Sequence, residues 1–460
     1  MDPMEYLPLT HGQKWWLGEM PGLKNPGWYN IEFLVRTLQA MDEAAIRKSV
    51  DYIVCKYESL RVRLIKKDGQ WLQNVYPLSE ADAFAAYDLS AYDPAARTEM
   101  IRRICIQERD GLLAERGNLV RILFFKFSGS EGRLWFCLHH LVSDFVSVLI
   151  VSGEFMAAYN SLVQGRTLKL QTMKEYRKWL YMVDGYCRDV LLPAELEYWL
   201  SLPWERAKVL PSDHPKKFYD DEIIISAIRD KTIVHTYREI TQWMDKEATL
   251  QLYGRYGAGF EDVLIAVFFM AIADQKDVDW LDITVCNAGR NILPAEYGIN
   301  VNNLLGWLST TRALLLARPA TGDLQSDIRH IVDQIRQVPN GGIGFIQISD
   351  HIGDAVLKET YFRQRQQAPI FFNYLGRVNT NFSNDLYETV QEDTGRGLHG
   401  WEIRNNLLAC DIGITNNQLF MTISYSEEYF EAGTITAIMD GMGGMFRAVA
   451  SGQQLMVKVA

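Results

Sequence analysis

The sequence predicts a mixed α/β fold in which strands and amphipathic helices alternate along the chain. Its 460 residues are 48% hydrophobic and 23% charged, a composition that supports ample buried core and two or three domains. Short apolar runs rich in β-branched and aromatic residues end at turn residues. Other segments carry apolar residues at helical spacing. These observations together favour α/β architecture over an all-helical or all-strand fold.

The elements of the first half follow from these patterns. Strands are expected at residues 31–38, 60–65, 119–127 and 134–138. The last two form a hairpin around the polar turn at 128–132. Helices are expected at residues 42–57, from Asp144 to Gly165, and over a polar stretch from 174 to 200.

The second half has a similar character, although no internal repeat is evident. Strands are expected at residues 223–228, 232–237 and 281–285, and helices at 243–253 and 260–272. Proline-marked joints at 202–203 and 210–215 are candidates for a boundary between two lobes.

The most informative stretch is the segment 139–144, which reads HHLVSD. Neighbouring strand residues point to opposite faces, so one imidazole can enter a cavity while the other packs. That arrangement suits proton-transfer chemistry. From spacing alone, Asp144 could orient His140 as the carboxylate of a hydrolase triad does.

Composition excludes several classes of function. The net charge of −10 and the lack of a dense basic run argue against nucleic acid as a partner. Six scattered cysteines match no zinc or redox motif, so we expect buried thiols, no bound metal and a reducing compartment. No secretion signal and no membrane-spanning apolar stretch is evident, so we expect a cytoplasmic location and no membrane.

Several short blocks, in order, resemble the condensation-domain superfamily of nonribosomal peptide synthetases. Segment 139–145 is similar to the HHxxxDG signature of that superfamily, and 56–61 (KYESLR) to its RHExLR block. Further matches are the opening block 7–16 and the later blocks 197–199, 288–290, 305–307, 341–345 and 372–376. The matching blocks span almost the whole chain.

The resemblance implies two lobes like chloramphenicol acetyltransferase, set in a V around a central tunnel. We place the N-terminal lobe at residues 1–180 and the C-terminal lobe at 181–460. The implied reaction joins an acyl or peptidyl group, held as a thioester on the phosphopantetheine of a carrier protein, to an amine or a hydroxyl. The implied partners are therefore acyl or peptidyl carrier proteins and a small amine or alcohol, and no bound cofactor is expected.

The resemblance also assigns roles to residues. His140 is the expected catalytic residue, either as proton acceptor or by holding the nucleophile beside the thioester. His139 is expected to be packed and hydrogen-bonded. Asp144 is expected to form a structural ion pair with Arg290 rather than to orient His140. Asn373 either faces the tunnel or meets backbone groups in a strand, and the sequence does not separate these interpretations.

Phe145 departs from the family, because the motif has glycine at this position. We expect Phe145 to narrow or reshape one arm of the tunnel and so restrict the substrate. Three tryptophans near the matching blocks, Trp15, Trp16 and Trp307, are expected in the core or at lobe contacts.

Two alternative functions belong to the same superfamily. Blocks around residues 306, 341 and 373 look closer to epimerization domains, but those use a glutamate in an EGHGR-like block. The corresponding stretch here, 286–290, reads CNAGR and lacks that carboxylate. Heterocyclization is disfavoured, because such domains replace the leading histidines by aspartate.

Two further interpretations remain open. One is a noncatalytic domain that docks to a carrier protein, and the other is an acyltransferase that uses acyl-CoA. The positions of the first and last blocks favour a free-standing enzyme over a domain excised from a synthetase. We also expect a monomer. Neither the donor nor the acceptor can be named from the sequence.

Overall fold

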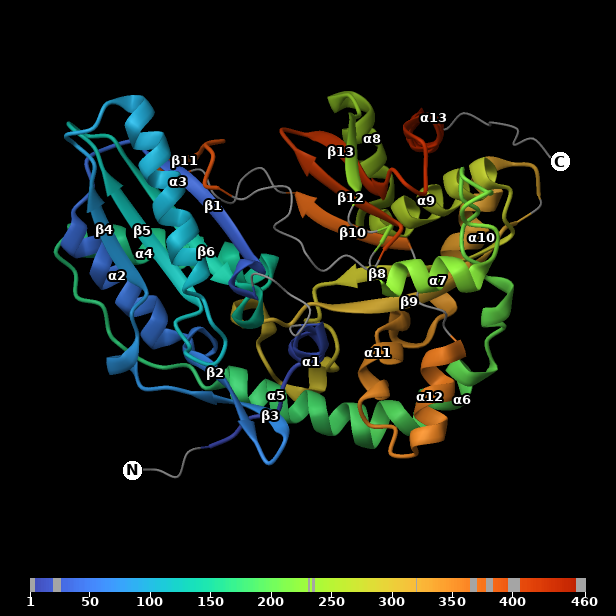
Figure 1. Cartoon of the computed structure of the whole chain (residues 1–460), viewed down its shortest axis with the longest axis horizontal. Helices are drawn as coiled ribbons and strands as arrows, with labels where there is room; N and C mark the ends of the chain where they lie inside the picture. The colour runs from blue at the N-terminus through green and yellow to red at the C-terminus, as the bar shows by residue number, and fades with distance from the viewer. Residues whose placement is uncertain are drawn as a thin grey trace. The chain divides into compact units, whose positions relative to one another are not determined.

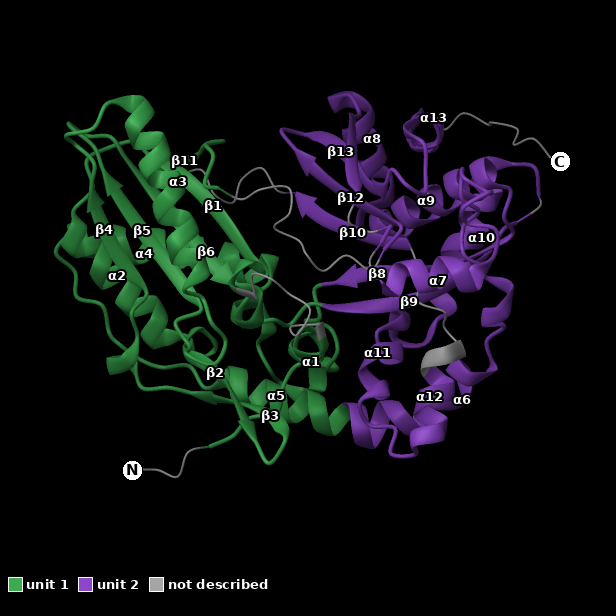
Figure 2. Cartoon of the chain, viewed as in Figure 1, with its two compact units in different colours: residues 1–186, 288–309, 380–403 green, residues 187–287, 310–379, 404–460 purple. Residues whose placement is uncertain are grey.

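The protein is represented by a computed structural model that describes residues 5–19, 26–230, 232–233, 236–319, 321–364, 370–377, 384–395 and 406–451. The chain divides into two compact units (Figure 2). Unit 1 comprises residues 1–186, 288–309 and 380–403, and unit 2 comprises residues 187–287, 310–379 and 404–460. Unit 1 thus includes two segments from the second half of the sequence. The predicted mixed α/β class is confirmed (Figure 1).

Unit 1 contains a five-stranded sheet in the order β11-β1-β6-β5-β4. Its strands are β1 (Asn30–Thr37), β4 (Phe84–Asp88), β5 (Val120–Lys126), β6 (Gly132–His139) and β11 (Tyr387–Thr389). A separate ribbon is formed by β2 (Val62–Lys67) and β3 (Gln70–Val75). The helices are α1 (His11–Glu19), α2 (Glu43–Lys56), α3 (Pro94–Asp110), α4 (Phe145–Val163) and α5 (Glu175–Tyr186).

Helices pack on both faces of this sheet. On one face, Phe33 and Phe136 stack across β1 and β6 at 4.6 Å, and Phe155 of α4 meets Phe136 at 5.2 Å. On the other face, Arg109 of α3 pairs with Glu32. Because side chains alternate along a strand, each face acquires its own helix. The end of β6 is therefore held between two packed layers.

Unit 2 contains a six-stranded sheet in the order β7-β13-β12-β10-β8-β9. Its strands are β7 (Tyr237–Trp243), β8 (Trp280–Asn287), β9 (Thr310–Ala317), β10 (Ile370–Arg377), β12 (Leu408–Thr415) and β13 (Gln418–Ser426). Phe268 of α9 packs on Phe372 of β10. The helices are α6 (Leu192–Ser201), α7 (Asp221–Arg229), α8 (Lys246–Tyr256), α9 (Phe260–Lys276), α10 (Leu324–Gln337), α11 (Gly344–Ser349), α12 (Ala355–Gln364) and α13 (Ala432–Ser451).

Most predicted elements of the first half are present within a few residues of their expected bounds. The strand predicted at 223–228 is wrong, because this segment lies in the helix α7. The Asp220 side chain accepts hydrogen bonds from the backbone of Glu222 and Ile223, which caps the helix. Ile224 and Ile228, four residues apart, are both buried on one helical face.

The six cysteines are free thiols, and five of them are buried, as the sequence predicts. Among the described helices, α4 is the single one with the length and apolarity of a membrane span. The bent pair α8–α9 reaches that length and apolarity only if its two helices are treated as one span. Core helices of globular domains have the same character, and Val148, Val151 and Phe155 of α4 are fully buried.

Candidate active site

The two histidines separate where β6 ends. His139 is the last residue of the strand, and His140 begins the short 3-10 helix η5 (His140–Val142). His139 is fully buried, its Nδ1 accepts a hydrogen bond from the Leu141 amide at 3.1 Å, and its ring meets Trp16 edge-on at 5.4 Å. A change of secondary structure, rather than strand alternation, therefore gives the two rings different environments.

His140 is half-buried between aromatic rings. Its backbone amide donates to the Tyr29 carbonyl at 2.8 Å. Its ring stacks on Tyr29 with centroids 4.9 Å apart and planes 19° apart, and lies 4.4 Å from the Trp307 ring. Burial lowers the pKa of His140 to about 4, and the Asp144 charge and nearby backbone groups oppose only part of this shift. The imidazole is therefore neutral near pH 7.

A buried polar network connects the opening block of the sequence to this turn. The Gln13 amide group of α1 donates to the Leu141 carbonyl at 2.9 Å and to the Gln73 side chain at 3.2 Å. Gln73 also accepts from the Tyr176 hydroxyl at 3.1 Å. Because buried amides need partners, this network holds the backbone immediately after His140.

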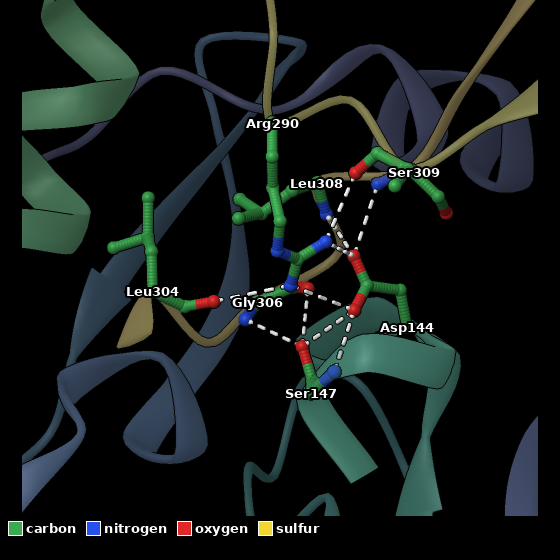
Figure 3. Close-up of polar contacts among 8 residues, drawn as sticks. Asp144, Ser147, Arg290, Leu304, Gly306, Leu308 and Ser309 are labelled. Carbon is green, nitrogen blue, oxygen red and sulfur yellow. Dashed lines mark hydrogen bonds and ion pairs between the residues drawn. The ribbon is translucent and has the colours of Figure 1, made fainter. Parts of the chain in front are cut away.

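The Asp144 carboxylate accepts six hydrogen bonds (Figure 3). One oxygen accepts from the Ser147 amide and hydroxyl, which makes Asp144 the N-cap of α4. The other accepts from the amides of Leu308 and Ser309, each at 3.1 Å. The Arg290 guanidinium donates to both oxygens, at 2.8 and 3.0 Å. These contacts occupy the carboxylate fully, and none of them involves His140.

Arg290 and its neighbour Gly289 shape the segment that reaches Asp144. Arg290 also donates to the carbonyls of Ala288 at 2.9 Å and Leu304 at 3.1 Å (Figure 3). Gly289 has φ +67°, and a Cβ atom added there would lie 1.6 Å from the Leu308 carbonyl oxygen. Only glycine is compatible with both the backbone angle and this close approach.

Phe145 is the first residue of α4 and is half-buried. Its backbone is helical, so the position does not require the glycine that the family motif has. The suggestion that its side chain restricts the substrate stays a prediction.

The structure places five of the six predicted site residues, His139, His140, Asp144, Phe145 and Arg290, in unit 1. Asn373 lies on β10 of unit 2, where its amide donates to the Asp411 carboxylate of β12 at 2.9 Å. A neighbouring side chain, rather than backbone, is thus its partner in this contact. Within the described part of the chain, no cluster of His, Cys, Asp or Glu could hold a metal ion.

Three residues of this site were not assigned a role from the sequence: Gln13, Tyr29 and Ser147. Trp307 was expected in the core or at a lobe contact, but not beside His140. Ser147 could have been found, because a polar residue three positions after an N-cap aspartate is a local signal. Tyr29 and Trp307 carry no such signal, since their contacts with His140 join residues that are distant in sequence.

Comparison with known proteins gives a consistent result along the chain. A family model described as a condensation domain matches residues 4–458. One component of the linear gramicidin synthase of Brevibacillus parabrevis is 26% identical over 454 residues, which are 97% of this chain and 8% of that protein. Tyrocidine synthase 1 of the same organism is 24% identical over 93% of this chain and 39% of its own length. The chain thus spans well under half the length of these relatives.

Solved structures share the fold. The epimerization domain from the third module of tyrocidine synthetase B superposes with a TM-score of 0.79 at 20% identity, covering 98% of this chain and 97% of that one. The first condensation domain of the CDA synthetase gives 0.65 at 15% identity, covering 99% of each chain.

Replacing Asp144 by alanine should destabilise unit 1 strongly. The change leaves the guanidinium of Arg290 and three backbone amides without their partner. A broken buried ion pair typically costs about 3–5 kcal/mol. The free energy of unfolding from urea denaturation measures the effect. Asp189→Ala is the control, because its pair with Arg188 is exposed, with side chains 63% and 55% accessible. Equal losses in the two variants would refute the structural role of Asp144.

Gly289→Ala should cost much more stability than Gly165→Ala. Both glycines have positive φ, of +67° and +74°, so both variants carry the left-handed penalty of about 1–2 kcal/mol. An added Cβ at Gly165 meets no atom within 4 Å, whereas at Gly289 it collides with the Leu308 carbonyl. Thermal unfolding of both variants would test the difference, and similar midpoints would show that the 288–309 segment can move aside.

Proposed function

The chain belongs to the condensation-domain family, and we propose that it transfers an acyl or peptidyl group from a carrier-protein thioester to an amine or hydroxyl acceptor. The synthetases to which it is related support this reaction. The observation that carries the proposal is the environment of His140, whose imidazole is neutral, half-buried and not bonded to a carboxylate. Its expected partners are a carrier protein bearing phosphopantetheine and a small acceptor, in the cytoplasm.

The proposed step balances without a cofactor. The acceptor nitrogen or oxygen attacks the thioester carbonyl, a C–N or C–O bond forms, and the C–S bond breaks. The pantetheine sulfur leaves and takes up the proton that the acceptor loses. Since a thioester is already activated, orienting two reactants supplies much of the acceleration.

The role of His140 in this step follows from its pKa. A base whose conjugate acid has a pKa of about 4 is poorly matched to removing a proton from an ammonium group completely. A neutral imidazole can still hydrogen-bond the nucleophile and accept its proton as positive charge develops in the transition state. We therefore assign His140 to holding and partly deprotonating the nucleophile.

Epimerization is the second candidate, and one observation favours it. The TM-score of 0.79 to the epimerization domain exceeds the 0.65 to the CDA condensation domain. Inverting Cα needs acid and base groups on both faces of the carbon. By the family resemblance, Cys286 and Asn287 at the end of β8 stand in the block where epimerization domains have a glutamate, so that carboxylate is missing here. We therefore rank epimerization below condensation.

His140→Ala should strongly slow transfer while leaving the fold intact. A carrier protein loaded with an acyl thioester is incubated with the enzyme and candidate amines or alcohols, and intact mass is recorded. If the carrier loses the acyl mass and a conjugate is released, condensation is supported. In the His140→Ala variant we expect this transfer to be roughly 100-fold slower or more. His11→Ala is a matched control at a half-buried histidine of α1. Retained transfer in His140→Ala would refute the proposal, and deuterium uptake at Cα from D₂O without transfer would select epimerization.

The rate with a hydroxyl acceptor should be independent of pH from about 8 down to about 5. Imidazole is neutral above its pKa, which is ordinarily near 6.5. Because the pKa of His140 is lowered to about 4, the ring becomes protonated only at a more acidic pH. A hydroxyl acceptor is chosen because it does not titrate in this range. An inflection near pH 6.5 in kcat would contradict the burial of His140.

A further inference from the structure

The His140 imidazole is not oriented by a carboxylate. All six hydrogen bonds of Asp144 go to Ser147, Arg290 and two backbone amides. Nδ1 of His140 is buried and lacks a well-formed hydrogen bond within the described part of the chain, although backbone groups of His140 and Ser143 lie near enough to act on its pKa. A histidine that acts at a fixed position needs another constraint on its ring, because its χ angles are otherwise free to rotate.

Aromatic rings provide that constraint. Tyr29 stacks on the imidazole at 4.9 Å, and Trp307 lies at 4.4 Å with its plane tilted by 51°. The two rings also contact each other at 5.6 Å. Rings at these separations make favourable contacts that depend on orientation, so the imidazole is held where it meets both.

Hydrogen bonds hold the residues immediately before and after Trp307 in the sequence. The Ser147 hydroxyl accepts from the Gly306 amide at 3.1 Å and shares its one proton between the Gly306 carbonyl at 2.9 Å and Asp144 at 2.7 Å. The amides of Leu308 and Ser309 bond to Asp144. The indole fits against Gly12 of α1, where an added Cβ would lie 2.4 Å from the ring. The position of the Trp307 indole is therefore set by hydrogen bonds from the start of α4 and by close packing on Gly12.

We propose that Tyr29 and Trp307 form an aromatic clamp that fixes the plane of the His140 imidazole, and that Asp144 positions His140 only through Trp307. This inference deepens the proposed function and rests on it, because the rate of acyl transfer reports on the clamp only if the protein catalyses that transfer. Tyr29 and Trp307 are positioning residues, because they act on the histidine. The clamp also shields the imidazole from water and thereby favours its neutral form.

The charged and titratable groups around the imidazole do not account for its neutrality. Asp144 is the charged group that acts on the His140 pKa, and its negative charge favours the protonated ring. Arg290 is paired with Asp144, and His139 is bonded to the Leu141 amide. Exclusion of water by the surrounding rings is the remaining cause.

Phenylalanine and leucine substitutions separate the effect of an aromatic ring from that of an aliphatic side chain. In Trp307→Phe and Tyr29→Phe an aromatic face remains, whereas Trp307→Leu and Tyr29→Leu remove the ring and leave a smaller side chain that admits water to the imidazole. The full chain, labelled with ¹⁵N-histidine, is titrated by NMR to obtain the pKa of His140, and acyl transfer from a loaded carrier is timed. We expect the leucine variants to raise this pKa toward 6.5 and to lower kcat roughly 10- to 100-fold with little change in KM. The phenylalanine variants should stay close to the parent in both.

The outcomes distinguish the clamp from the proposed function. Leucine variants that match the phenylalanine variants in pKa and rate overturn the clamp, and so does a lower rate with an unchanged His140 pKa. If the parent transfers no acyl group but the leucine variants still raise the pKa, the clamp stands and the proposed reaction fails. Tyr29 is half-buried, so its variants provide the test if Trp307→Leu does not fold.

Discussion

The saturated Asp144 carboxylate is the constraint on which the rest of the site depends. A charge that is only 1% exposed is costly unless it is paired and fully hydrogen-bonded. Asp144 meets this requirement with donors from the start of α4 and from the 288–309 segment. The same bonds that satisfy the charge therefore fix a distant part of the chain, and with it the ring of Trp307, beside His140.

Much of unit 1 could be predicted because its signals are local. The apolar run before His139, the polar turn at 128–132 and the N-cap pattern of Asp144 and Ser147 each act within a few residues. The helix α7 shows where local patterns mislead. Its three consecutive isoleucines suggest a strand by propensity, but the Asp220 cap and burial of one helical face decide for the helix.

The site was less predictable than the fold, for a physical reason. Asp144 and Arg290 are 146 residues apart, and nothing in the composition of either neighbourhood selects the other; only the family resemblance suggested the pair. Tyr29 lies outside the matching blocks and Trp307 lies in the block 305–307, but neither segment indicates a contact with His140. Contacts of this kind are set by the way the segments pack, so a single sequence does not contain them in readable form.

Asp144 and His140 interact through charge but share no hydrogen bond. A free carboxylate near an imidazole stabilises the imidazolium and raises its pKa. Here Asp144 also favours the protonated imidazole, but burial lowers the pKa of His140 by more than the aspartate raises it. The structural role of Asp144 thus rests on its saturated hydrogen bonds, and the neutrality of His140 rests on its burial among the rings.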